Sequence, residues 1–115
     1  MEVKIKVRDN VTVLKPDGRL IGVAGREFRR VIQAQLRTAS EPPKFLFDFA
    51  QVTRMDSTAL GVLIGLHVSI AGAGGRIGLI NVNQFVHNML VMARLTTVLE
   101  RFESETEAIA SLQRT

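Results

Sequence analysis

The first residues of the chain alternate between apolar and charged side chains, and this alternation predicts two strands. In "EVKIKVRD" (2–9), Val3, Ile5 and Val7 alternate with charged residues, which is the period of a half-buried strand. Asp9-Asn10 turns the chain, and "VTVL" (11–14) begins a second strand. "KPDG" (15–18) indicates a turn, because Pro presets φ and Gly tolerates a positive φ. "RLIGVAG" (19–25) is then expected to be a short extended entry into a helix.

Between residues 25 and 38 the apolar positions change to a helical period. The positions expected to face the core are Phe28, Val31, Ile32, Gln35 and Leu36. The prolines of "SEPP" (40–43) end this helix, since Pro cannot continue it. "KFLFDF" (44–49) predicts a central strand buried on both faces, and "AQVTRMDS" (50–57) is expected to be a loop. A second helix is predicted from near Ser57 to about Ala71, where the glycines of "GAGG" (72–75) stop it.

The last third of the chain continues the alternation of strands and helices. "RIGLINV" (76–82) predicts a buried strand, residues 83–95 a helix, and "VLERF" (98–102) a short last strand. The apolar face of the helix over 83–95 is expected to contain Phe85, Val86, Met89, Leu90 and Met92. Ser104 with Glu107 three residues on is a capping box, which predicts a final helix over 104–114.

This order of elements predicts the fold class. Strand–helix alternation implies right-handed crossovers and a largely parallel sheet. We therefore expect one α/β domain over residues 1–115, with a mixed, mostly parallel sheet of about five strands and about four helices.

The net charge of +4 is unevenly distributed, with +5 in residues 1–40 and −1 in residues 41–115. A basic protein suggests nucleic-acid binding, but the chain has six Phe, no Trp, no Tyr and no RNA-stacking or zinc-finger motif. We therefore expect no nucleic-acid partner. A solvated basic face is the simpler interpretation, and it would also suit an acidic protein partner.

The sequence offers little for an enzyme. It contains no Cys, which excludes disulfides, thiolate nucleophiles and zinc–thiolate sites. His67 and His87 lie in apolar helical patterns typical of core or boundary positions, and no His cluster has metal-ligand spacing. Ser57 does not lie in a GxSxG motif, and "GAGG" is not followed by the Lys-Ser/Thr of a nucleotide P-loop. We expect no catalysis, no cofactor and no metal.

The hydropathy profile predicts a cytoplasmic location. The longest apolar stretch, from Ala59 to Ala73, is shorter than the span of about 20 residues that crosses a bilayer. The N-terminus alternates charged and apolar residues, so no signal peptide is indicated.

The stretch "RMDSTALGVLIG" (54–65) differs from its surroundings, because two hydroxyls and a carboxylate precede an apolar helix. Asp56 or Ser57 could accept hydrogen bonds from the free N–H groups at the helix start. A phosphate on Ser57 would be stabilised by the same amides and by the helix dipole, although Asp56 adds a like charge. Gly61 and Gly65, four residues apart, are expected to allow close backbone approach. A helix with almost no polar face suggests contact with a partner along its first turns.

This stretch also carries a family resemblance. "FDFAQVTRMDSTALGVLIG" (47–65) resembles the signature of STAS domains, in particular the bacterial anti-sigma-factor antagonists: a hydrophobic strand, a loop ending in Asp-Ser-Ser/Thr-Gly/Ala-Leu-Gly, then a helix. "VTVLKPDGRL" (11–20) is similar to the second strand of the family and its Gly-x-Leu step, and residues 74–112 resemble its usual ending.

The resemblance implies a partner switch. In the antagonists, the serine after that Asp is phosphorylated by an ATP-dependent anti-sigma kinase, which the unmodified form binds, and a serine phosphatase resets it. Carried over, the modified residue is Ser57, with Thr58 the weaker candidate. The partner-binding residues would be Asp56, Thr58, Leu60 and Gly61.

The sequence departs from the antagonists at two positions. Ala59 replaces the commoner Gly, and Ile21 stands where many antagonists carry an Asp close to the phosphorylation site. The alternative to a kinase substrate is therefore a STAS scaffold without phosphate turnover, or a transporter-associated STAS subunit. Weak homodimerisation stays open.

Overall fold

The computed structural model describes residues 1–39 and 41–114. In these residues the chain forms six strands and four helices. In chain order they are β1 (Glu2–Arg8), β2 (Val11–Leu20), α1 (Val23–Thr38), β3 (Lys44–Asp48), β4 (Val52–Met55), α2 (Ser57–Gly72), β5 (Arg76–Ile80), α3 (Gln84–Met92), β6 (Glu100–Arg101) and α4 (Glu105–Leu112).

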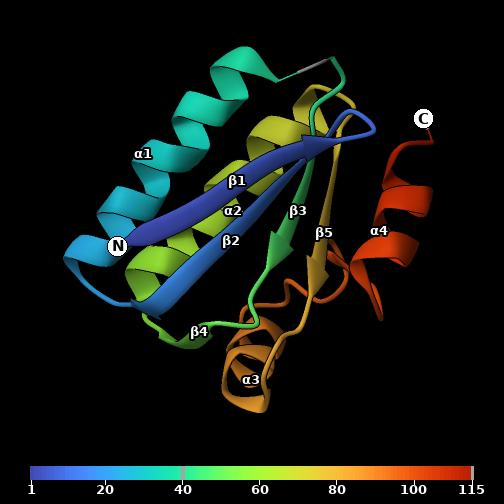
Figure 1. The fold of residues 1–115 in the computed structure, drawn as a ribbon. Helices are drawn as coiled ribbons and strands as arrows, with labels where there is room; N and C mark the ends of the chain where they lie inside the picture. The colour runs from blue at the N-terminus through green and yellow to red at the C-terminus, as the bar shows by residue number, and fades with distance from the viewer. Residues whose placement is uncertain (40, 115) are drawn as a thin grey trace.

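The strands form one mixed sheet with the order β1-β2-β3-β5-β6, and β4 pairs with β2 beyond the end of β3. Only β1 and β2 pair antiparallel; the other pairs are parallel. Figure 1 shows α1 and α2 side by side on one face of the sheet and α4 on the other, with α3 at the end near β4. The predicted α/β fold with a mostly parallel sheet is confirmed.

The core lies mainly between the sheet and the α1–α2 layer. Every residue of the central strand β3 is buried, as predicted, and Phe45 and Phe47 face this layer. A smaller cluster lies on the opposite face, where Leu46 packs with Ala108, Ile109 and Leu112 under α4. These two clusters place both faces of β3 out of solvent, which explains its continuous run of apolar residues.

The N-terminal hairpin forms around Asp9 and Asn10, whose φ angles are 51° and 65°. Two successive positive φ angles are those of a type I′ turn, which Asp and Asn tolerate better than most residues. The strand β1 is present as predicted, but its apolar face is not half-buried throughout. Val3 packs against the core, whereas Ile5 and Val7 are 41% and 68% exposed, because β1 is the edge strand of the sheet.

The turn predicted at "KPDG" (15–18) is wrong, because β2 runs straight through it to Leu20. Pro16 has no N–H to donate, yet it causes no break. The pairing of β2 with β3 ends at Leu14 and its pairing with β4 begins at Gly18, so Pro16 lies in the gap between the two neighbours. Gly18, at φ 109°, then supplies the irregularity that shifts the register toward β4.

The loop predicted over residues 50–57 is also wrong, since it contains strand β4. This strand buries only its first and last residues, Val52 and Met55, and exposes Thr53 and Arg54 between them. Four residues with that burial pattern show neither the alternation nor the apolar run by which strands are recognised.

The helices begin and end close to their predicted bounds. The first, α1, starts at Val23, two residues before the expected position, and buries Phe28 and Ile32 as expected. In "SEPP" (40–43), Ser40 lies outside the described residues. In α3 the prediction is partly wrong: Val86 and Leu90 are buried and Met89 packs against the core, but Phe85 and Met92 are 41% and 84% exposed. The Ser104 hydroxyl accepts the backbone N–H of Glu107 at 3.1 Å, as the capping box predicted.

Candidate functional site

The sheet topology brings two separate loops together at the start of α2. Because β2 and β4 are parallel neighbours with Leu20 opposite Met55, the segments that follow them leave the same edge of the sheet. The first segment leads through Gly22 into α1, and the second leads through Asp56 into α2. The backbone N–H of Asp56 donates to the Leu20 carbonyl at 3.1 Å, which continues the pairing past the end of β4.

Asp56 is the residue that joins these segments. One carboxylate oxygen accepts from the backbone N–H groups of Thr58 (3.0 Å) and Ala59 (3.2 Å), so Asp56, rather than Ser57, caps α2. The other oxygen accepts from the N–H of Gly22 at 2.8 Å. These hydrogen bonds, that of Gly22 first, hold the pKa of the Asp56 carboxyl below its usual range.

Ser57 is the first residue of α2 and its side chain is exposed. Among the residues that the structure describes, no hydrogen bond occupies its hydroxyl. Ser57 also shares the outer face of the helix with Gly61, Ile64 and Val68, all exposed, because these positions follow at steps of four, three and four. This hydroxyl is therefore accessible from solvent.

Thr58 is more enclosed than Ser57. It is half-buried and lies against α1, where a methyl group added at Gly25 would be 3.1 Å from the Thr58 methyl. Gly25 is thus the glycine that permits close approach of the two helices. Within the chain, no such close approach occurs at Gly61 or Gly65, since a methyl group at either position would meet nothing within 4 Å.

The two other candidate partner-binding positions differ in exposure. Leu60 is half-buried and packs against the core, whereas Gly61 is exposed. Ile21 and Val23, which border Gly22 on either side, are 43% and 60% exposed. Two exposed apolar side chains therefore lie on either side of the Gly22 that donates to the capping residue Asp56.

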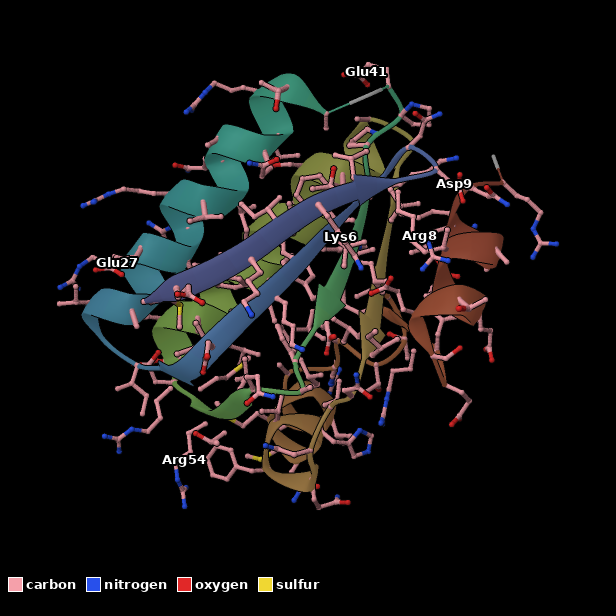
Figure 2. The ribbon with its side chains drawn as sticks, in the orientation of Figure 1. Lys6, Arg8, Asp9, Glu27, Glu41 and Arg54 are labelled. Carbon is pink, nitrogen blue, oxygen red and sulfur yellow. The ribbon has the colours of Figure 1, made fainter. Side chains whose placement is uncertain are left out.

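On the other side, β4 presents a side chain that the sequence analysis did not single out. Arg54 stacks over the ring of Phe85 at the start of α3, with its guanidinium carbon 4.7 Å from the ring centroid. Figure 2 shows Arg54 at the end of the molecule that carries α3. This pair was missed because β4 was not predicted and because Phe85 was expected to pack inward.

The two histidines and the glycines of "GAGG" (72–75) were the other residues considered for chemistry. His67 and His87 are half-buried, in agreement with boundary positions, and His87 Nδ1 lies 2.8 Å from the Arg101 guanidinium. Gly74 follows α2 with φ 74°, as expected for a helix stop. In residues 1–39 and 41–114, no group of three or more His, Asp or Glu side chains could hold a metal ion.

Comparison with known proteins identifies the family. A family model described as the STAS domain matches residues 2–108, nearly the whole chain. The chain belongs to the STAS domain family. This STAS domain is 25% identical over 109 residues to a protein of Thermotoga maritima named "Putative anti-sigma factor antagonist", covering 95% of this chain and 96% of that protein.

Solved structures share this fold. A crystal structure of such a Thermotoga maritima antagonist has a TM-score of 0.88 at 24% identity, covering 97% of this STAS domain and 95% of that chain. The Bacillus cell fate determinant SpoIIAA in its phosphorylated form has a TM-score of 0.74 at 20% identity, covering 96% and 98%. In the described part of the chain, every helix is too short or too polar to cross a membrane.

Proposed function

We propose that this STAS domain is an anti-sigma-factor antagonist that binds an anti-sigma kinase and is switched off by phosphorylation at Ser57. The observation that carries the proposal is the exposed, unengaged hydroxyl of Ser57, at the first position of a helix already capped by Asp56. The names of its relatives agree with this role. The STAS domain itself would act by binding, in the cytoplasm, and would need no cofactor.

The environment of Ser57 suits an on–off switch. The N–H groups of Thr58 and Ala59, which could otherwise neutralise a phosphate, already donate to the Asp56 carboxylate. A phosphate of about −1.5 to −2 charges would therefore be added beside an existing negative charge. Burying that phosphate in an interface without an opposite charge beside it costs several kcal/mol of binding free energy. A loss of about 3 kcal/mol already weakens binding more than a hundredfold.

The phosphorylation step is tested by incubating the protein with candidate anti-sigma kinases and ATP, followed by mass spectrometric mapping. We expect one phosphate, on Ser57, and a serine phosphatase should remove it. Ser57→Ala should abolish labelling, and the matched Thr58→Ala variant should be labelled normally. Labelling that persists in Ser57→Ala and disappears in Thr58→Ala would assign the site to Thr58 instead.

The binding step needs a separate measurement. Ser57→Asp should bind a captured kinase at least a hundredfold more weakly than the unmodified protein by calorimetry, while circular dichroism shows the same melting temperature. Leu60→Glu should also weaken binding, because the exposed part of Leu60 lies one turn from Ser57. An unchanged affinity for Ser57→Asp would show that a negative charge at position 57 does not control binding, which would contradict the proposed switch.

One observation favours a second candidate function. Ile21, 43% exposed and directly before the Gly22 that Asp56 holds, is apolar where many antagonists have an Asp. An apolar residue there is compatible with a STAS scaffold that binds a partner constitutively. Tight binding together with no labelling by any kinase would support this candidate.

A further inference from the structure

A trough runs between α1 and α2 on the outer side of the helical layer, with a volume of about 280 Å³. Its α1 wall contains Arg29, Gln33 and Leu36, and its α2 wall contains Gly61, Gly65 and Ser69. The two helices lie side by side in Figure 1, and the trough lies between residues 29–36 of α1 and residues 61–69 of α2. It is distinct from the Asp56–Gly22 junction, which lies at the start of both helices.

Helix α1 carries a basic stripe beside the trough, and Arg29 is the arginine of this stripe that lines the trough itself. Arg26, Arg29, Gln33 and Arg37 follow at steps of three, four and four, so they form one stripe along the helix. In the described residues, none of these three arginines forms an ion pair. The stripe spans 12 residues, and its ends are about 16 Å apart at 1.5 Å per residue.

The α2 side has no counterpart to this basic stripe, because α2 contains no Asp, Glu, Lys or Arg. Ile64 and Val68 are 42% and 66% exposed on the outer face of the helix. Between them and the arginine stripe lie Gly61 and Gly65, where a methyl group would meet nothing within 4 Å. Glycine inside a helix costs about 1 kcal/mol relative to alanine, so α2 gives up stability at two positions where alanine would fit.

From these features we propose that the trough binds an acidic amphipathic helix of a partner protein. Such a helix would place its apolar stripe on Leu36, Ile64 and Val68, and its carboxylates on Arg29 and Arg37. The absent side chains at Gly61 and Gly65 let its backbone approach α2 closely. The length of the arginine stripe matches about three turns of a helix. Charge complementarity selects this occupant, because a second copy of the chain would bring arginines against arginines.

Binding of a partner helix in the trough does not depend on phosphorylation of Ser57. Absence of labelling by kinases would leave it intact, and failure of the peptide experiment below would leave the kinase assay unaffected.

The probe is a 16-residue synthetic helical peptide with leucines at steps of three and four and glutamates on both flanks. Its matched counterpart carries lysines in place of the glutamates. Titration into the ¹⁵N-labelled full chain in low salt should shift the amide signals of α1 from Arg29 to Arg37 and of α2 from Gly61 to Ser69. The lysine peptide should leave those signals unmoved. Raising the salt concentration should weaken the binding of the acidic peptide.

Two variants separate charge from shape. The double variant Arg29→Glu/Arg37→Glu should weaken binding of the acidic peptide at least tenfold. Its matched control, Lys4→Glu/Lys15→Glu, makes the same charge change on the opposite face of the sheet and should change the affinity less than threefold. Gly65→Leu fills the trough and should also weaken binding at least tenfold, with circular dichroism confirming that each variant is folded.

Three outcomes would overturn the proposal. The first is equal binding of the two peptides, or no binding of either at millimolar concentration. The second is an equal effect of the control double variant. The third is tighter binding to vesicles of equal phosphatidylglycerol and phosphatidylcholine, or to a 20-base-pair DNA, with the same dependence on Arg29 and Arg37. That result would make the stripe a membrane or nucleic-acid surface.

Discussion

The Asp56 carboxylate accepts hydrogen bonds from three backbone N–H groups. Its removal should therefore lower the free energy of unfolding by more than is usual for a residue that is only half-buried. In Asp56→Ala, the N–H groups of Thr58 and Ala59 lose their cap, which costs about 1 kcal/mol. The N–H of Gly22 loses a 2.8 Å bond to a charged acceptor, worth about another 1.5 kcal/mol. We expect a total loss of about 2–3 kcal/mol in the free energy of unfolding, equivalent to a fall in melting temperature of about 10 °C.

The assay is urea unfolding followed by far-UV circular dichroism, since the chain has no Trp or Tyr to report by fluorescence. Asp56→Asn is the informative partner variant. Asn caps helices about as well as Asp, so it should lose roughly half as much stability as Asp56→Ala. Asp17→Ala is the matched control, because Asp17 is exposed and, among the described residues, its carboxylate accepts no hydrogen bond. This variant should change the free energy of unfolding by less than about 0.5 kcal/mol.

The pH dependence gives a second check with a definite sign. The pKa of Asp56 is lowered in the folded protein, so its contribution is fully present above the ordinary Asp value of about 3.9. That contribution is lost as the pH falls through the lower folded-state pKa. The stability difference between wild type and Asp56→Asn should therefore shrink below pH about 4. A difference that is constant down to pH 2, or Asp56→Ala within 0.5 kcal/mol of wild type, would refute the assigned role of the carboxylate.

Three further predictions concern packing and charge. Gly75→Ala should destabilise the protein by about 2 kcal/mol or more in urea unfolding, because its methyl group would collide with the Pro43 carbonyl oxygen; wild-type stability would contradict this. Gly61→Ala should raise the melting temperature by about 4 °C, since the helix gains propensity at no steric cost; an unchanged or lower temperature would count against it. Arg76→Met should raise the pKa of Glu100, which the bidentate Arg76 guanidinium lowers, as read by carboxyl NMR titration; an unmoved pKa would be inconsistent with the pair.

The elements that were predicted correctly have strong local signals. The central strand β3 has an apolar, aromatic centre, α1 has a clear helical period, and Ser104 caps α4 with a recognisable motif. The start of α2 was located for the same reason, since a carboxylate and hydroxyls directly precede an apolar run. Which of Asp56 and Ser57 caps the helix could not be decided, because both side chains can accept the same N–H groups.

The errors in the sheet have a common physical cause, because a local sequence pattern does not show which strands will pair with each other. Pro16 signals a turn on its own, and only the gap between β3 and β4 makes it acceptable within β2. The strand β4 is held by its pairing with β2 and not by its own sequence. Likewise, the bond from Gly22 to Asp56 joins residues 34 apart, and no spacing rule connects them. The sequence therefore predicts the residues of the site, but it does not predict that the segments around Gly22 and Asp56 meet there.

The double pairing of β2 has a consequence for synthesis on the ribosome. The hairpin with β1 closes through a two-residue turn, so it can form as soon as both strands emerge. The other edge of β2 must wait for β3 and β4, which end 35 residues later at Met55. At about 5–20 residues per second, that edge stays open for about 2–7 seconds. Lys15 and Pro16 lie near the middle of this open edge, and a charged residue and a proline make an edge a poor template for pairing with another nascent chain. Pro16, which on its own suggests a turn, therefore disfavours mispairing of the growing sheet.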